Sequence, residues 1–188
     1  MIHIETHRLV LRIVPLAGLA STAAGNIKAT QGLVGEKLPE EWFEDSWVYK
    51  LRHEQWLADP SYAPWSIRAI ASRETGEIVG NMNCHHKPMP FVYNGKESLA
   101  TEMGYTIFES YRRQGIAFEA ITAFTAWART DGLESVILSI QPTNVASLAL
   151  ARKLGAVQIG SQIDEKDGPE DIYLFNIDSS LRQKPESP

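Results

Sequence analysis

The alternation of apolar and polar residues along this chain predicts a series of strands. In residues 4–13, Leu9 and Leu11 fall on one face and Arg8 and Arg12 on the other, a period of two that is typical of a half-buried strand. The same reasoning predicts further strands at residues 64–70, 77–84, 101–108, 156–162 and 171–177. The run at 135–140 is almost continuously apolar, which favours a strand that is buried on both faces and parallel to its predecessor.

Other segments carry apolar residues at intervals of three and four, the spacing of an amphipathic helix. Predicted helices cover residues 16–30, 40–58, 117–128 and 144–154. Thr143 or Asn144 is expected to cap the last of them, because a side-chain oxygen there can accept from a free N–H group of the first turn. The third helix leads from the strand at 101–108 to the strand at 135–140, as a crossover between parallel strands requires.

Glycines mark the expected turns and irregularities. Gly76 closes a hairpin between the strands at 64–70 and 77–84, and Gly80 inside the second strand indicates a bulge. The pair Asn94-Gly95 is a turn signal within an expected loop.

The composition limits the classes of protein to consider. With 188 residues and 44% hydrophobic residues, the chain suits one domain, expected at 1–178, followed by a polar tail at 179–188. A net charge of −5 argues against a nucleic-acid partner. One cysteine excludes an intrachain disulfide, no apolar run approaches the roughly 20 residues of a membrane span, and early charges argue against a signal peptide. We therefore expect a cytoplasmic monomer or homodimer without a membrane partner.

The most informative charges lie between the strand at 101–108 and the helix at 117–128. Arg112 and Arg113 stand near the N-terminus of that helix, where the helix dipole opposes positive charge. A bound anion would resolve the conflict, because the free N–H groups of the helix start and both arginines would attract it. Gly115 has no Cβ and would let the backbone approach the anion closely. The charge pattern alone fits equally well a surface turn with two solvated arginines.

Three stretches resemble motifs of a known enzyme family. Arg112-x-x-Gly115-x-Ala117 resembles the acetyl-CoA signature R/Q-x-x-G-x-G/A of the GNAT N-acetyltransferases. The strand segment Glu102-Met103-Gly104-Tyr105 resembles the E-x-G-Y strand of their RimJ/RimL-like branch, which acetylates ribosomal-protein N-termini. The segment Thr6-x-Arg8-Leu9-x-Leu11-Arg12 is similar to the opening strand of the same branch, and its arginines are expected to be structural.

A fourth stretch, Asn144-x-x-Ser147-x-x-Leu150-x-x-Lys153-x-Gly155, resembles the family's second acetyl-CoA motif, N-x-x-A/S-x-x-L-Y-x-K-x-G-F. It departs from that motif at Ala151, where the family often has a tyrosine that protonates the leaving thiolate, and at Ala156, where the family has an aromatic residue. In the RimL-like branch a serine at the position of Ser147 is thought to act as the acid. Asn144 could be a helix cap, and Ser147 could be a small residue that lets the helix pack.

The resemblance implies an α/β (α+β) GNAT fold: a mixed, mostly antiparallel sheet, splayed at a central parallel pair, with helices on both faces. It implies acetyl-CoA as co-substrate, no metal, and direct transfer of the acetyl group to an amine. Glu102 is then the candidate general base, or else a carboxylate paired with an arginine on the strand face, and Ser147 is the candidate acid. The residues expected to bind acetyl-CoA are Tyr105, Ile107, Arg112, Arg113, Gln114, Gly115, Ile116, Ala117, Asn144 and Ser147.

The sequence does not decide which amine accepts the acetyl group. A protein or peptide N-terminus is slightly favoured over a small amine such as an aminoglycoside, a polyamine or an amino sugar. A non-catalytic acyl-CoA-binding module is the competitor from another class, and Ala151 is its best support. A Rossmann dehydrogenase is disfavoured because the glycine fingerprint is missing from a first strand–helix turn.

Two further groups of residues carry alternative interpretations. Aromatic side chains crowd the first half of the chain and could form a core layer or line an acceptor groove. They are Trp42, Phe43, Trp47, Tyr49, Trp56, Tyr62, Trp65, Phe91 and Tyr93. The adjacent His85 and His86 lack further ligands at metal-binding spacing, although one of them could titrate near neutral pH at an acceptor site.

Overall fold

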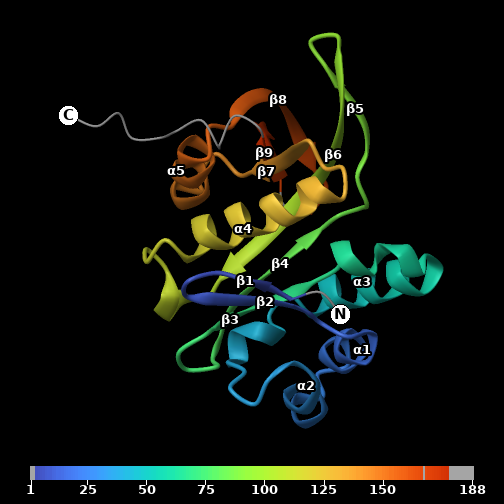
Figure 1. Ribbon diagram of the computed structural model, residues 1–188, viewed down its shortest axis with the longest axis vertical. Coiled ribbons are helices and arrows are strands. Elements are labelled where there is room, and N and C mark those ends of the chain that lie inside the picture. Colours follow the sequence, from blue (N-terminus) through green and yellow to red (C-terminus); the bar gives the residue numbers. More distant parts are fainter. Residues whose placement is uncertain (1–2, 167, 178–188) are drawn as a thin grey trace. The chain divides into compact units, whose positions relative to one another are not determined.

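The computed structural model describes residues 3–166 and 168–177, so the tail predicted at 179–188 lies outside the described residues (Figure 1). The chain divides into two compact units. The first unit comprises residues up to 87 together with 104–124, and the second comprises 88–103 together with the residues from 125 onward. The prediction that residues 1–178 form one domain remains a proposal.

The first unit contains an antiparallel set of strands. They are β1 (Ile4–Glu5), β2 (Leu9–Ile13), β3 (Arg68–Ser72), β4 (Ile78–Cys84) and the last residues of β6 (Lys96–Ile107). Each of the first three pairs with the next, and β6 is the neighbour of β4 in the strand order. Leu9 and Leu11 of β2 are buried, as the alternation predicted.

Helical segments complete the first unit. They are α1 (Leu16–Ala23), α2 (Ile27–Val34), α3 (Ser46–Ala58), the first residues of α4 (Ile116–Thr130), and the 3-10 turns Glu40–Phe43, Pro60–Trp65 and Glu109–Tyr111. The core of this unit includes Val14, Leu19, Trp42, Tyr49, Ile67 and Phe108. Trp42 and Tyr49 pack with their ring centroids 5.0 Å apart, which confirms the core interpretation for these two rings.

The single helix expected at 16–30 is in fact two helices. Gly25 adopts φ +66°, a left-handed conformation that ends α1, and the Asn26 side chain then caps α2 by accepting from the Ala29 N–H at 3.1 Å. The strand expected over 4–13 is also interrupted, because the Thr6 hydroxyl accepts from the Leu9 N–H at 2.8 Å and turns the chain.

The strand expected at 64–70 begins later than predicted. Residues Pro60–Trp65 form a 3-10 turn, because the Asp59 carboxylate accepts from the Ser61 N–H at 2.9 Å and Pro60 suits the first helical position. The hairpin of β3 and β4 is confirmed, and its register shifts beside Gly80, where the bulge was predicted.

The second unit is built around a parallel pair of strands. Its elements are β5 (Met89–Tyr93), the first part of β6, β7 (Ser135–Ile140), α5 (Val145–Lys153), β8 (Val157–Asp164), β9 (Gly168–Asn176) and the remainder of α4. β7 runs parallel to β6 over three residue pairs, from Ala100↔Ser135 to Glu102↔Ile137. The pairs β1–β2, β2–β3, β3–β4, β5–β6, β7–β9 and β8–β9 are antiparallel, so the predicted mixed, mostly antiparallel sheet is confirmed.

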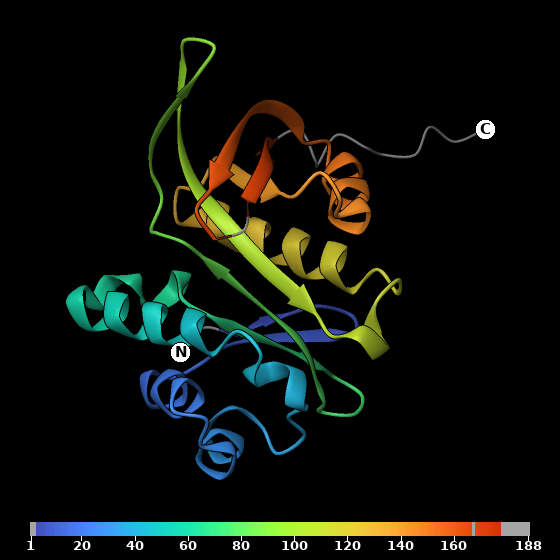
Figure 2. The same cartoon turned by 180° about the vertical axis from the view of Figure 1, so that it is seen from behind.

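One expected loop is a hairpin. β5 pairs with the first residues of β6, and the turn between them has Asn94 at φ +50° and Gly95 at φ +74°. Two successive residues with positive φ are typical of a type I′ turn, which matches the twist of antiparallel strands. The hairpin rises beyond β7, β8 and β9 and is seen clearly from behind in Figure 2. The strand predicted at 101–108 therefore begins earlier, at Lys96.

Candidate active site

The loop between β6 and α4 presents a row of backbone donors. The φ angle is +61° at Arg113 and +76° at Gly115, whereas Gln114 between them is not left-handed. Such an alternation turns successive N–H groups toward one side, as in backbone nests that bind anions. Among the described residues, no acceptor lies within hydrogen-bond range of the backbone N–H groups of Arg113 to Ala117. The loop therefore has the donors that an anion needs.

Side-chain hydrogen bonds hold this loop in shape. Arg112 donates from Nε to the Ile107 carbonyl at 2.8 Å, and Gln114 donates from Nε2 to the Ser110 carbonyl at 3.2 Å. Arg112 therefore braces the loop, a role that the charge pattern alone did not predict. The Arg113 side chain is exposed and carries its charge at the same turn.

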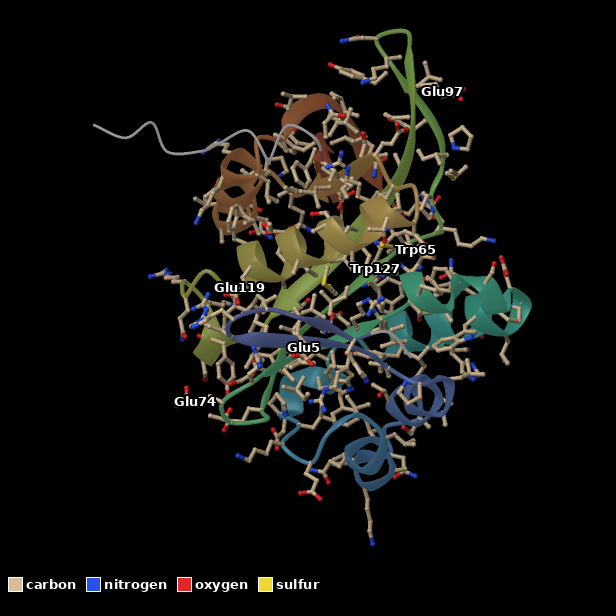
Figure 3. All side chains as sticks on the ribbon, in the orientation of Figure 1. Glu5, Trp65, Glu74, Glu97, Glu119 and Trp127 are labelled. Carbon is tan, nitrogen blue, oxygen red and sulfur yellow. The ribbon has the colours of Figure 1, made fainter. Side chains whose placement is uncertain are left out.

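The first turn of α4 follows directly. Ile116 is buried, and Ala117 is half-buried. Glu119 lies in the same turn, where a carboxylate suits the helix dipole, and it is labelled in Figure 3 beside the β1–β2 strands. Burial raises the pKa of Glu119, but hydrogen bonds from the Thr6 hydroxyl and from the backbone and side chain of Arg8 outweigh this and hold its pKa below the ordinary value.

The predicted residues of β6 have different surroundings. Glu102 is half-buried, and it lies opposite Ile137 of β7. Ile107 is buried, and its carbonyl accepts from Arg112. Tyr105 is half-buried.

On α5, Asn144 is the helix cap, because its side chain accepts from the Ser147 N–H at 3.1 Å. The cap interpretation of Asn144 is therefore confirmed. Ser147 is half-buried in the first turn. Ala151, at the position of the family tyrosine, is 0% exposed, so a side chain of tyrosine size has no room there in this packing.

The predicted site residues divide between the two units. The first unit contains Tyr105, Ile107, Arg112, Arg113, Gln114, Gly115, Ile116 and Ala117. The second unit contains Glu102, Asn144 and Ser147. Within the first unit, the loop brings together the residues from 112 to 117, and the hydrogen bond from Arg112 connects them to the end of β6.

Sequence reasoning missed the surroundings of Glu119. Thr6 and Arg8 were noted only as part of an opening strand, yet both hydrogen-bond to this carboxylate. The available signal was an acidic residue in the first turn of a helix that follows two arginines. The contacts themselves span more than a hundred residues and could not be read from local patterns.

The remaining predictions concern metals and membranes. In the part of the chain that the structure describes, no three His, Cys, Asp or Glu side chains are grouped as a metal site would need. Across residues 3–166 and 168–177, no helix combines the length and apolar character needed to cross a membrane.

Of the two histidines noted in the sequence, His85 contacts α3 through its backbone. Its carbonyl accepts from the Gln55 side chain at 2.9 Å, which connects the residue after β4 to α3.

Comparison with known proteins gives a consistent result. Residues 19–157 match the family model described as the acetyltransferase (GNAT) domain. Among solved structures, the ribosomal-protein-S5-alanine acetyltransferase from Vibrio fischeri is similar, with a TM-score of 0.65 and 16% identity over 95% of this chain and 98% of that chain. RimJ of Mycobacterium smegmatis in complex with CoA-disulfide has a TM-score of 0.59 and 17% identity over 94% and 85% of the two chains.

A third similar structure is RimL, a ribosomal L7/L12 alpha-N-protein acetyltransferase in complex with coenzyme A. Its TM-score is 0.61, with 16% identity over 95% of this chain and 99% of that chain. At such identities the likeness concerns the fold.

Proposed function

We propose that this chain, which belongs to the GNAT family of acetyltransferases, uses acetyl-CoA to acetylate a primary amine, with a protein or peptide N-terminus as the favoured acceptor. The observation that carries the proposal is the loop of Arg113 to Ala117. Its N–H groups lack acceptors among the described residues, and exposed arginines accompany them. A pyrophosphate needs both features, and a helix N-terminus adds a favourable dipole.

The transfer itself follows from the chemistry of a thioester. The amine nitrogen bonds to the carbonyl carbon, the carbon–sulfur bond breaks, and coenzyme A leaves as a thiolate. The attacking amine must first lose a proton, and we assign this to Glu102, directly or through water. Ser147 would return a proton to the leaving sulfur. Backbone N–H groups between Tyr105 and Ile107 are the candidates to stabilise the oxyanion.

The choice of acceptor rests on a different kind of support. Several similar structures are named as acetyltransferases of ribosomal proteins, which favours a protein N-terminus here. The alternative acceptor is a small amine such as an aminoglycoside, a polyamine or an amino sugar. A protein N-terminus and a small amine have the same reacting group, so the chemistry of Glu102 does not distinguish them.

Thiol release from acetyl-CoA tests the function directly. The panel should contain peptides with a free N-terminus and the small amines named above. It should also contain versions of the same peptides whose N-terminus is blocked and whose only primary amine is a lysine side chain. We expect release with free N-termini and a mass increase of one acetyl group at that position. Release with small amines alone would contradict the favoured acceptor. If coenzyme A does not bind at all, the assignment of the loop as the pyrophosphate site is also wrong.

Gly115→Ala is expected to weaken binding of coenzyme A about tenfold while the fold survives, because an alanine at a φ of +76° is strained by about 1–2 kcal/mol and the nest is distorted. A Cβ at this position would meet nothing closer than Arg8 Nη2 at 3.6 Å, an ordinary contact. Calorimetric titration with coenzyme A measures the effect.

Gly76→Ala is the matched control, because Gly76 has φ +72°, lies in the same unit, and has open space where its new Cβ would lie, with no heavy atom within 4 Å. It should cost similar stability and leave the affinity for coenzyme A unchanged. Equal affinities for the two variants would show that the Gly115 backbone does not bind the coenzyme.

A further inference from the structure

Thr6, Arg8 and Glu119 form one hydrogen-bonded cluster, which we call the Arg8 clamp. The Glu119 carboxylate accepts from the Thr6 hydroxyl at 2.5 Å, from the Arg8 N–H at 3.1 Å and from Arg8 Nε at 2.7 Å. Arg8 Nη2 also lies 2.6 Å from Glu119 Oε2, so two guanidinium nitrogens contact the same carboxylate oxygen, while Oε1 accepts from Thr6 and from the Arg8 N–H. Charge-assisted hydrogen bonds of this kind are short and strong.

The same guanidinium contacts the loop that precedes α4. Arg8 Nη1 donates to the Gln114 carbonyl at 3.0 Å, and Nη2 lies 3.6 Å from the place that a Cβ on Gly115 would occupy. One side chain therefore ties the opening of β2 both to the first turn of α4 and to the middle of the nest. Because Arg8 donates to the Gln114 carbonyl, this oxygen points to the guanidinium. It does not accept from the neighbouring N–H groups, which therefore stay available to an anion.

The charges give this contact a second consequence. The Glu119 side chain is only 20% exposed, and it belongs to the first turn of α4, the same turn that contains Ile116 and Ala117. An uncompensated negative charge in this turn would repel a pyrophosphate bound at the N–H groups of Arg113 to Ala117. Arg8 neutralises Glu119, so α4 has an acidic first turn without losing its attraction for an anion.

We propose that Arg8 is a positioning residue for coenzyme binding: it shapes the nest through Gln114 and cancels the charge of Glu119 beside the pyrophosphate. This inference rests on the proposed function. Arg8 acts through the loop and the carboxylate and takes no part in the acetyl transfer. It therefore affects only substrates that carry the pyrophosphate.

The test compares two acetyl donors. Acetyl-CoA has the pyrophosphate, whereas acetyl-pantetheine has the same thioester without it. Arg8→Ala is expected to raise the Kd of coenzyme A and the KM of acetyl-CoA about tenfold, and to leave kcat/KM for acetyl-pantetheine within about twofold of the wild type. A general loss of structure would lower the activity with both donors.

Further variants separate the two parts of the proposal. Arg8→Lys keeps the charge but cannot serve Glu119 and the Gln114 carbonyl with one planar fork, so we expect an intermediate Kd, about threefold above the wild type. Glu119→Gln introduced into Arg8→Ala removes the unbalanced carboxylate and should recover part of the lost affinity. Lys87→Ala is the matched control, because Lys87 is as exposed as Arg8, at 45%, and forms a 2.6 Å ion pair with Asp59 in the same unit.

The outcomes are distinct. A tenfold loss that is confined to the pyrophosphate donor supports the proposal, provided that Lys87→Ala retains the wild-type Kd. Equal losses with both donors, or no change in the Kd of coenzyme A, would overturn it. If the wild-type protein itself does not bind coenzyme A, the proposed function fails, and the inference built on it fails too.

Discussion

Glu102→Gln is expected to lower kcat for amine acetylation by about a hundredfold to a thousandfold, with little change in the affinity for coenzyme A. The amide keeps the shape of the side chain but cannot accept the proton of the attacking amine. Glu102 is half-buried, and burial is one of the means by which proteins tune a catalytic carboxylate. Thiol release at saturating acetyl-CoA and acceptor measures kcat, and titration with coenzyme A measures binding.

Glu97→Gln is the matched control for this experiment. Glu97 lies on the same strand, β6, but is exposed and close to the tip of the β5–β6 hairpin, where it is labelled in Figure 3. It should leave kcat unchanged. Ser147→Ala should lower kcat only about tenfold, because a thiolate is a good leaving group and needs little help from an acid. A kcat of Glu102→Gln within about threefold of wild type would remove Glu102 as the base.

Gly80→Ala is expected to lower the free energy of unfolding by about 3 kcal/mol or more, the largest stability effect that we predict. A Cβ on Gly80 would lie 2.3 Å from the Thr106 carbonyl oxygen and 3.2 Å from the Ile107 Cα. Both contacts are with backbone, which cannot rotate away as a side chain can. The variant must therefore separate β4 from the end of β6, which urea denaturation will measure.

Gly32→Ala provides the comparison. Gly32 lies inside α2, and a Cβ there would meet nothing within 4 Å. Alanine is the better helix former, so this change should raise the free energy of unfolding by about 0.5–1 kcal/mol. If Gly80→Ala were as stable as the wild type, the close approach of β4 to the last residues of β6 would be wrong.

Local patterns predicted the parts of the site that depend on neighbouring residues. The cap at Asn144 depends on an amide three residues away, and a side chain at that spacing reaches it in almost any tertiary setting. Gly115 was singled out for its missing Cβ, and the structure adds that its φ is left-handed, at +76°. The exposed charge at Arg113 follows likewise from its place in the turn.

Boundaries were less predictable where two local signals competed. Apolar spacing over residues 16–30 favoured one helix, although Gly25 and Asn26 supplied a stop and a new cap inside it. The alternation of Leu9 and Leu11 was correct, but the Thr6 turn cut the strand short. In both cases a hydrogen bond of a single polar side chain decided the result.

The residue pattern alone was sufficient to predict the family, most of the helices and strands, the parallel strand pair and the position of the loop between β6 and α4. These follow from short-range periodicity and from motifs whose residues are close in the chain. Only the folded chain shows that Arg8 contacts Glu119, at a separation of 111 residues, and that Gly80 lies against Thr106. Such contacts depend on how distant segments pack, and no local pattern in either segment specifies the other.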